Sequence, residues 1–241
     1  MAQGAGTSRA AAPNSTELPP MPLEDELDQR RVAARGLMAP TDRRAIEDTI
    51  ERLRMLQIAE HSLGVGETLP DFALPDAAGR VVTSDELLDR APLVLAFFRG
   101  GWCPYCDRTL KVLEAARSVI EATGAVLVGV APVTPAELAR IAAEKGLSFP
   151  LLSDTDGALS RLCGLLYAMT PAQVAYYGGR RGIDVAARSA GVGWAVPVPA
   201  TYVVARDGTV AYAFADPDWA RRAEPDELAT AANRLTRDGE G

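Results

Sequence analysis

The hydrophobic pattern of the chain alternates between short apolar runs and longer amphipathic stretches. Two continuous apolar runs, 93–98 and 125–130, predict buried strands, because each is too short for a buried helix. A shorter run over 149–152 predicts a third strand piece. Apolar residues at helical spacing predict the intervening helices, which begin near Cys103 and cover about 135–145 and 157–165. Strands that alternate with helices indicate an α/β fold, with a parallel-rich sheet covered on both faces.

Residues that are typical of helix N-termini locate the starts of three helices more closely. Thr134-Pro135-Ala136-Glu137 combines an N-cap, a proline at the first helical position and a glutamate at the third. Thr83 with Glu86 predicts a capping box for a brief helix. Thr170-Pro171-Ala172-Gln173 predicts another, at the start of a helical insert over about 170–194.

Turn signals predict two antiparallel hairpins. In the first, apolar pieces at 72–74 and 81–82 flank a Pro, Asp and Gly turn. In the second, the β-branched and aromatic runs 201–205 and 209–214 are joined through Asp207-Gly208. A final helix is expected over about 225–235.

The N-terminal part has a different character. Residues 1–22 offer almost nothing to bury and are expected to be disordered, whereas 23–63 predicts a helical arm ahead of the main domain, 64–241. The arm comprises a helix over about 23–37 and another from Thr41, as N-cap, to about 62. The predicted apolar face of the second helix contains Ile46, Ile50, Leu53, Leu56 and Ile58. The arm packs either on the domain or on a second subunit in a homodimer.

Composition narrows the possible partners and location. The 241 residues are 48% hydrophobic, enough for a substantial core. Because the net charge is −7 and no basic block occurs, nucleic acid is not expected as a partner. No apolar run approaches the roughly 18 residues of a membrane span, and the N-terminus lacks the apolar core of a signal peptide. With three cysteines, the chain is expected to be cytoplasmic.

The candidate chemistry lies where the strand over 93–98 ends. Gly100 and Gly101 break the strand, and Cys103 and Cys106 follow at the predicted helix start. A helix N-terminus stabilises a thiolate, the nucleophilic form of cysteine, so Cys103 is the predicted nucleophile. Cys106, one turn later, is within reach of a sulfenic acid or mixed disulfide on Cys103. The pattern predicts a redox site.

Other interpretations of the polar residues are less specific. Cys-X-X-Cys pairs also bind zinc, but neither Cys163 nor His61 offers a second ligand pair, and no cofactor is expected. Cys163 is typical of a buried hydrophobic thiol, and His61 of a solvated residue near a helix end. The Arg221-Arg222 pair is most simply a solvated face. The insert, with Tyr176 and Tyr177, forms a lid or dimer surface over the cysteines, or else packs on the sheet.

The order of these elements, with Trp102-Cys103 and Pro199 downstream, resembles the thioredoxin fold. More specifically, the chain resembles the peroxiredoxin (alkyl hydroperoxide reductase and thiol-specific antioxidant) superfamily, in its group with a thioredoxin-type cysteine pair. The matching motifs lie at 66–74, 98–106, 197–204 and 222–225. The resemblance implies a mixed sheet sandwiched by helices, with an N-terminal helical extension.

The resemblance also implies an activity. Cys103 corresponds to the peroxidatic cysteine, whose thiolate attacks hydrogen peroxide or an organic hydroperoxide to give a sulfenic acid. Cys106 then resolves it as a disulfide, which a thioredoxin-like donor reduces. Pro199 corresponds to a cis-proline facing the cysteines and, with Arg99, Gly100 and Trp102, is assigned to substrate binding.

Two departures from the family pattern keep other functions open. Gly100 stands where typical peroxiredoxins carry a threonine, and Ala200 where many carry an arginine that orients peroxide. Arg99 is a candidate to supply the positive charge instead, and the N–H groups of Gly100 or Gly101 a candidate oxyanion site. The alternatives are a thiol–disulfide oxidoreductase with little peroxidase activity and a non-catalytic, redox-sensing interaction module.

Overall fold

The computed structural model describes residues 21–189 and 191–238. The expected tail over 1–22 therefore lies outside the described residues except for Met21 and Pro22. The helices are α1 Leu23–Leu37, α2 Pro40–Met55, α3 Ser84–Leu88, α4 Pro104–Glu121, α5 Pro135–Lys145, α6 Ala158–Leu162, α7 Pro171–Val174, the π-helix η1 Ala175–Arg180, α8 Val185–Arg188 and α9 Pro225–Asp238. The strands are β1 Ala73–Pro75, β2 Val81–Thr83, β3 Leu93–Phe97, β4 Val126–Ala131, β5 Leu151–Ser153, β6 Leu166–Ala168, β7 Ala195–Pro197, β8 Ala200–Val204 and β9 Val210–Ala215.

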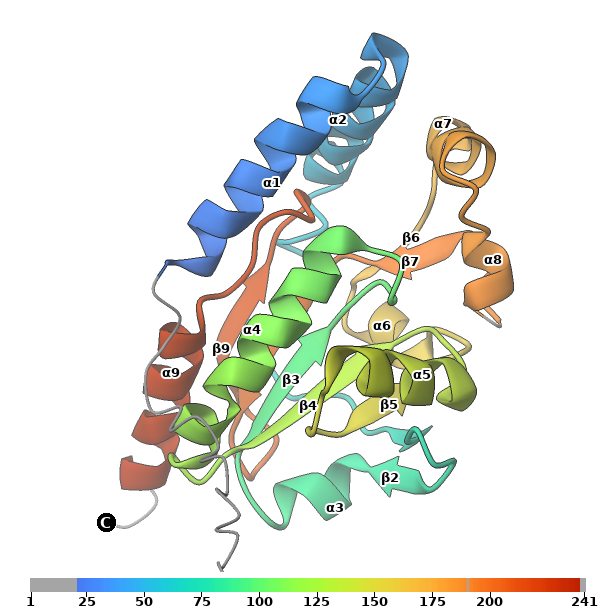
Figure 1. Cartoon of the computed structure of the whole chain (residues 1–241). Coiled ribbons are helices and arrows are strands. Elements are labelled where there is room, and N and C mark those ends of the chain that lie inside the picture. The colour runs from blue at the N-terminus through green and yellow to red at the C-terminus, as the bar shows by residue number, and fades with distance from the viewer. Residues whose placement is uncertain (1–20, 190, 239–241) are drawn as a thin grey trace, which may run out of the picture.

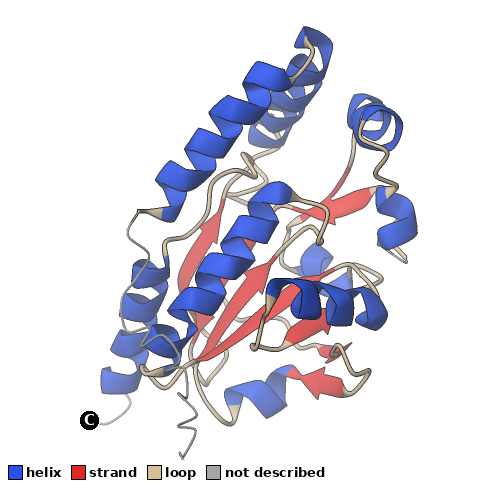
Figure 2. Cartoon of the chain, viewed as in Figure 1, coloured by secondary structure: helices blue, strands red, loops and turns tan. Residues whose placement is uncertain are grey.

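A five-stranded mixed sheet forms the centre of the fold (Figures 1 and 2). The strand order is β5-β4-β3-β8-β9, in which β3, β4 and β5 run parallel and β8 and β9 are antiparallel to their neighbours. At the end of β3, Phe97 lies opposite Val130 on one side and Ala200 on the other. Both predicted hairpins form, as β1-β2 and β8-β9.

Strand β3 is buried on both faces because successive side chains point to opposite sides of the sheet. Leu93, Leu95 and Phe97 join one apolar cluster, while Val94 and Ala96 join the other. Helices α4, α5 and α9 contribute to the second cluster, and α2, α3 and α6 to the first. The predicted sandwich is confirmed.

The second arm helix differs from its predicted bounds. Helix α2 begins with Pro40 at its first position, not at a Thr41 cap, and it ends at Met55. Gln57 then adopts a φ of 50°, in the left-handed region that stops a helix. Ile50 and Leu53 are buried as predicted, but Leu56 lies beyond the helix and is exposed.

The arm packs on the same chain. Leu23 and Leu27 of α1 are fully buried in a cluster with Val112 of α4. Both carboxylate oxygens of Glu224 accept backbone hydrogen bonds from the first turn of α1, from Leu23 at 2.9 Å and from Glu24 at 2.7 Å. An anion at a helix N-terminus satisfies unpaired N–H groups and complements the helix dipole. The arm is therefore fixed at its beginning by a residue of the C-terminal region.

The insert leaves the domain through a two-stranded antiparallel sheet, β6-β7, which the sequence analysis does not include. Thr170 and Gln173 form the predicted capping box at the start of α7. After α7 the chain widens into the π-helix η1, which buries Tyr177. Helix α7 contacts α2, so the insert and the arm meet. Both helices lie beyond the same end of the sheet, at the top of Figure 1.

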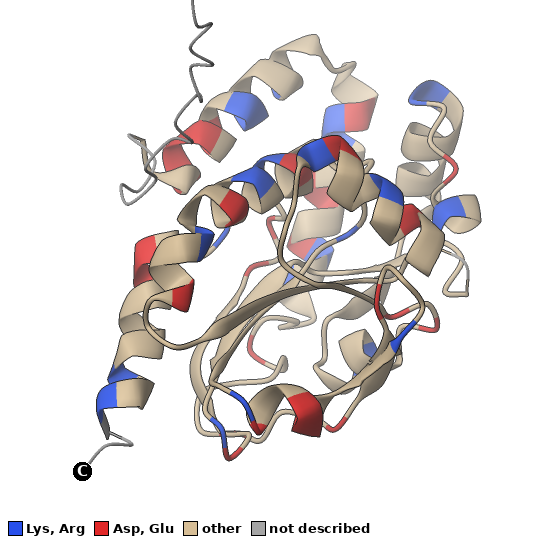
Figure 3. Ribbon diagram, turned by 60° about the horizontal axis from the view of Figure 1, so that its bottom comes forward, with Lys and Arg blue, Asp and Glu red and all other residues tan. Residues whose placement is uncertain are grey.

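Basic and acidic residues are interspersed along most of the described helices (Figure 3). The first turn of α1 is acidic, with Glu24, Asp25 and Glu26. Within residues 21–189 and 191–238, no helix is long and apolar enough to cross a membrane. The same residues hold no group of three or more His, Cys, Asp or Glu side chains arranged for a metal ion.

Truncating Leu27 to alanine should loosen α1, because removing a fully buried leucine side chain costs about 2–5 kcal/mol. Amide hydrogen exchange along α1 should accelerate by a factor of about 30 or more, which corresponds to about 2 kcal/mol. Val32→Ala is the matched control, since Val32 lies on the same helix but is 68% exposed. Equal exchange in both variants would contradict the packing of α1 on α4.

Candidate active site

The cysteine pair lies where β3 turns into α4. Cys103 is the N-cap of α4 and Pro104 occupies the first helical position, so the predicted helix start is confirmed. The backbone N–H of Cys106 donates to Sγ of Cys103 across 3.4 Å. Both cysteines are buried and neither is in a disulfide. This cap leaves the two sulfurs on one helical turn, just beyond the C-terminal end of the central strand β3.

The backbone before the pair requires glycine at one position. Gly100 has a φ of 130°, which side-chain-bearing residues rarely adopt. A Cβ atom there would lie 2.8 Å from Nε1 of Trp102, well inside van der Waals contact. The threonine of typical peroxiredoxins therefore does not fit this turn, which instead brings the Trp102 indole back over Gly100.

A cavity of about 110 Å³ lies beside Cys103. Trp102 and Cys103 form part of its wall, whereas Cys106 does not line it. The arm and the insert complete its predominantly apolar wall with Ile46, Ile50, Tyr176, Tyr177 and Ile183. Both segments therefore help to enclose the cavity beside Cys103, and the insert is more than a surface excursion.

Arg99 enters this cavity from the end of β3. Only 1% of its surface is exposed. Its guanidinium carbon lies 4.8 Å from the ring centre of Trp102, 4.7 Å from Trp219 and 5.5 Å from Tyr177. Such cation–π contacts contribute about 0.5–2 kcal/mol each. Nε and Nη2 have no hydrogen-bond partner among the described residues, so this cavity-lining residue carries two buried, unpaired donors.

Burial opposes the charge of Arg99 and by itself lowers the pKa. Tyr167, Tyr177 and the two cysteine thiols act in the other direction, and the pKa of Arg99 rises above its ordinary value. Arg99 therefore stays positively charged in the cavity.

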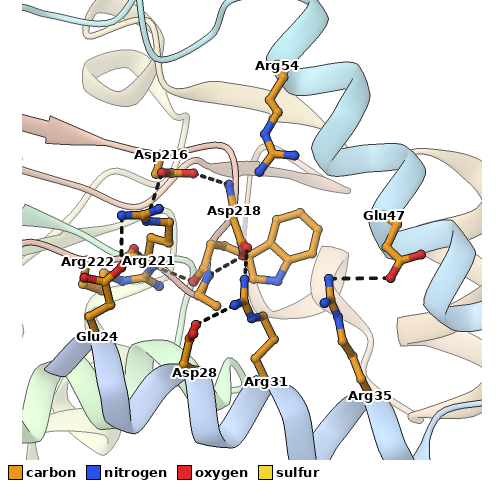
Figure 4. A network of polar contacts seen from close by, with 12 residues as sticks. Glu24, Asp28, Arg31, Arg35, Glu47, Arg54, Asp216, Asp218, Arg221 and Arg222 are labelled. Carbon is orange, nitrogen blue, oxygen red and sulfur yellow. Dashed lines mark hydrogen bonds and ion pairs between the residues drawn. The ribbon is translucent and has the colours of Figure 1, made fainter.

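An ion pair closes the cavity between the arm and the loop before α9. Arg31 donates from Nη1 to Oδ2 of Asp218 at 2.8 Å, and it also pairs with Asp28 on its own helix (Figure 4). Asp218 is itself buried and accepts from the backbone N–H of Ala220 at 3.0 Å. This ion pair holds the loop that presents Trp219 to the cavity.

Arg222 corrects one prediction. Arg221 is exposed as predicted, but Arg222 is buried, and its Nη2 donates to Sγ of Cys106 at 3.6 Å. Its Nη1 donates to the backbone oxygens of Trp219 and Arg221, both at 2.5 Å. Adjacent arginines differ because the chain turns here into α9, which directs one side chain outward and the next inward.

The two thiols titrate as a pair. Burial, the hydrogen bond to Cys106 and the charge of Cys106 raise the pKa of Cys103 well above its usual value, against Arg99 and Arg222. Burial also raises the pKa of Cys106, but the hydrogen bond from Cys103 and the charge of Arg222 outweigh it and lower that pKa to about 6. The directions of these two pKa shifts favour a thiolate on Cys106, beside Arg222, over one on Cys103. The prediction of a thiolate on Cys103 followed from the helix N-terminus and took Arg222 to be exposed.

The expectation of a cis-proline at Pro199 is wrong, because every peptide bond in the described residues is trans. Trans is the preferred form even before proline, by about 0.5–1 kcal/mol. The backbone N–H of Val198 donates to Leu165 at 2.9 Å, which keeps the chain extended from β7 into β8. Pro199 is buried, and neither Pro199 nor Gly100 lines the cavity.

Cys163 is buried and His61 is exposed, as predicted. Burial together with the nearby Asp154 raises the pKa of Cys163 to about 12, so it stays a neutral thiol. Asp218, Trp219 and Arg222 are the residues that the sequence analysis missed. The sequence did contain a signal for Arg222, because the motif at 222–225 is one of those that resemble the peroxiredoxin superfamily.

The similarity of the chain to known proteins identifies its family. The sequence model described as the AhpC/TSA family matches residues 65–213, more than half of the chain. The chain belongs to the AhpC/TSA family. A putative peroxiredoxin of Haemophilus influenzae is 28% identical over 103 residues, which are 43% of this chain and 66% of the relative. One of Mycobacterium tuberculosis is 33% identical over 91 residues, 38% of this chain and 57% of the relative.

The aligned segments thus span somewhat less than two thirds of these AhpC/TSA relatives. Solved structures confirm the thioredoxin-like, peroxiredoxin-type fold. The peroxidoxin BcpB of Mycobacterium tuberculosis has a TM-score of 0.55 at 21% identity and covers 73% of this chain and 97% of its own. The thiol peroxidase of Chromobacterium violaceum has a TM-score of 0.54 at 18% identity and covers 75% and 90%.

The shared thiolate should be visible in a pH titration. Thiolate absorbance in the ultraviolet should rise with a midpoint near pH 6, since the pKa of Cys106 is lowered to about 6. A free cysteine would titrate near 8.5. Cys163→Ser should leave the curve unchanged, because the pKa of Cys163 is raised to about 12. Absence of any thiolate signal below pH 8 would contradict the electrostatics of the pair.

Gly100→Ala should destabilise the fold and move Trp102, because the new Cβ overlaps the indole. Gly66→Ala is the control, since Gly66 also has a positive φ, 87°, but open space around its Cβ position. Backbone strain of this kind costs about 1–3 kcal/mol in both variants, so Gly100→Ala should cost more. Denaturant unfolding and tryptophan fluorescence measure the two effects. If both variants lost the same free energy of unfolding and tryptophan fluorescence did not change, the predicted overlap of the new Cβ with Trp102 would be contradicted.

Proposed function

We propose that this AhpC/TSA protein is a thiol-dependent peroxidase that reduces hydrogen peroxide or organic hydroperoxides. Cys103 is the residue oxidised by peroxide, Cys106 resolves it as a Cys103–Cys106 disulfide, and a thioredoxin-like dithiol donor recycles the pair. The observation that carries the proposal is the different access of the two sulfurs. Cys103 lines the cavity, and Cys106 lies behind it without reaching the cavity wall.

The first step uses the shared proton of the pair. The Cys106 thiolate takes the proton of the Cys103 thiol through the hydrogen bond between them. The Cys103 sulfur then attacks one peroxide oxygen, the O–O bond breaks, and the leaving alkoxide or hydroxide takes a proton from solvent. Cys103 becomes a sulfenic acid and the peroxide is reduced by two electrons.

Arg99 is suited to hold the peroxide during this attack. Its unpaired Nε and Nη2 are buried donors, and leaving such groups without a partner costs about 1–3 kcal/mol each. A peroxide oxygen, and more so the leaving oxyanion, would satisfy them. In this role Arg99 replaces both the missing arginine at Ala200 and the missing hydroxyl at Gly100. Trp102 and Trp219 keep the guanidinium in place and form the apolar wall for an organic substituent.

The second step closes the pair. Cys106 first returns its proton to solvent and then attacks the sulfur of the Cys103 sulfenic acid as a thiolate. The S–O bond breaks, and the leaving hydroxide takes up a proton to become water. The third step is exchange with a donor dithiol, which is oxidised while both cysteines are reduced. The hydrogen bond from the Cys106 N–H to the Cys103 sulfur holds the two on one turn for closure.

Thiol–disulfide exchange with little peroxidase activity is the second candidate function. It is favoured by the absence of the family threonine at Gly100 and of the family arginine at Ala200. The two candidates use the same sulfurs, and they differ in which oxidant reacts quickly with Cys103.

Cysteine variants should separate the roles of the pair. After a peroxide pulse, the unsubstituted protein should contain a Cys103–Cys106 disulfide by mass spectrometry. Cys106→Ser should instead accumulate a sulfenic acid on Cys103 that is captured by dimedone, because nothing resolves it. Cys103→Ser should consume peroxide at the background rate, and Cys163→Ser should behave as the unsubstituted protein.

The proposal is wrong if Cys103→Ser consumes peroxide as fast as the unsubstituted protein. Stopped-flow measurement then distinguishes the two candidate functions. Slow oxidation of Cys103 by both hydrogen peroxide and cumene hydroperoxide, alongside rapid reduction of a disulfide substrate, would favour thiol–disulfide exchange.

A further inference from the structure

The two sulfurs of the pair face different surroundings. Cys103 meets the cavity, where peroxide or a donor thiol arrives. Cys106 is fully buried on the other side, towards the loop before α9, where Nη2 of Arg222 lies 3.6 Å from its sulfur. An incoming group therefore reaches Cys103 first, and the group that leaves Cys103 must be the sulfur of Cys106.

Arg222 is held in position by backbone atoms. Its Nη1 donates to the carbonyl oxygens of Trp219 and Arg221, and the side chain is 6% exposed. Among the ion pairs of the described residues, Arg31 and Arg221 bind the neighbouring carboxylates Asp218 and Asp216, and none involves Arg222 (Figure 4). A buried guanidinium without a carboxylate partner is costly unless another anion compensates its charge. The sulfur of Cys106 is positioned to be that anion.

We propose that Arg222 is a positioning residue that keeps Cys106 as a thiolate, which makes Cys106 the leaving group when the disulfide is reduced and the nucleophile when the sulfenic acid is resolved. The inference rests on the proposed function for its place in the peroxidase cycle. The leaving-group role applies to thiol–disulfide exchange as well.

The reduction step follows from this arrangement. A donor thiolate enters the cavity and attacks Sγ of Cys103, forming a donor–Cys103 disulfide. The Cys103–Cys106 bond breaks, and its electron pair stays on Cys106 as a thiolate beside Arg222. The second thiolate of the donor then attacks the donor sulfur and releases Cys103, which takes up a proton. The donor is oxidised to its own disulfide by the loss of two electrons.

The groups around Cys106 support this division of roles. The charged or titratable groups that act on its sulfur are Cys103 on the same turn, Arg99 from the end of β3 and Arg222 from the loop before α9. Tyr167 of β6 is near enough to feel the charge of Cys106, and its own pKa is raised by burial, so it stays neutral. Both cations favour the thiolate. Arg99 also lines the cavity beside Cys103. Arg222 donates a hydrogen bond to the sulfur of Cys106 and to no other sulfur among the described residues.

Three substitutions test the proposal. Arg222→Met removes the charge and keeps the bulk, Arg222→Lys keeps the charge, and Arg221→Met removes a neighbouring charge that is exposed. Each protein is equilibrated with mixtures of reduced and oxidised dithiothreitol, and the fraction of Cys103–Cys106 disulfide is measured by mass spectrometry. A stabilised thiolate favours the dithiol, so Arg222→Met should shift the equilibrium constant about tenfold towards the disulfide, or about 30 mV.

Arg222→Lys should shift the constant less than threefold, and Arg221→Met should not shift it. In Arg222→Met the thiolate titration should also move to higher pH. Dimedone should capture more sulfenic acid on Cys103 after a peroxide pulse, because resolution is slower. Should Arg222→Met fail to fold by circular dichroism, Arg222→Gln takes its place, since glutamine donates a hydrogen bond to the carbonyls without a charge.

The proposal is overturned if the uncharged variant shows the equilibrium and titration of the unsubstituted protein, or if Arg222→Lys shifts both as far as Arg222→Met does. A different pair of results would contradict the proposed function alone. If Cys103 does not react with peroxide but the dithiothreitol equilibrium depends on the charge at Arg222, the peroxidase proposal fails and the leaving-group role stands.

Discussion

The structure depends on compensating a buried negative charge. Two sulfurs share one thiolate at the junction of β3 and α4, and both are buried. Arg99 and Arg222 both act on them, one from the end of a central strand and one from the loop before the last helix. Because a buried cation is costly as well, each arginine needs its own support. Three aromatic rings surround Arg99, and two carbonyl oxygens hold Arg222.

This support comes from parts of the chain that are not central to the fold. The arm provides Arg31, the insert provides Tyr177, and the loop before α9 provides Trp219. The mixed sheet supplies the position of the cysteines, but the cavity is enclosed only when these three segments meet. The fold is shared with proteins at about 20% identity, and the enclosure of the site depends on the arm, the insert and the loop before α9.

The sequence predicted the elements whose signals are local. The strand 93–98, the cysteine N-cap and the Thr170 capping box follow from runs and start residues, and all are present. The end of α2 was missed because a left-handed Gln57 has no sequence signal comparable to glycine. Arg222 was missed because periodicity does not distinguish the inward from the outward residue of a pair in a loop. The cavity could not be predicted, since its walls meet only in three dimensions.

The contact between Glu224 and the first turn of α1 joins residues about 200 positions apart in sequence. On a ribosome, which makes the chain from its N-terminus, the arm emerges about 200 residues before its partner. Such distant contacts also form slowly, because closing so long a loop costs entropy before any contact repays it. The cysteines are therefore synthesised and the central strands can pair while the cavity still lacks its cover. Enclosure of the thiolate is a late event in the life of each newly made molecule, and until then the pair is open to oxidants of any size.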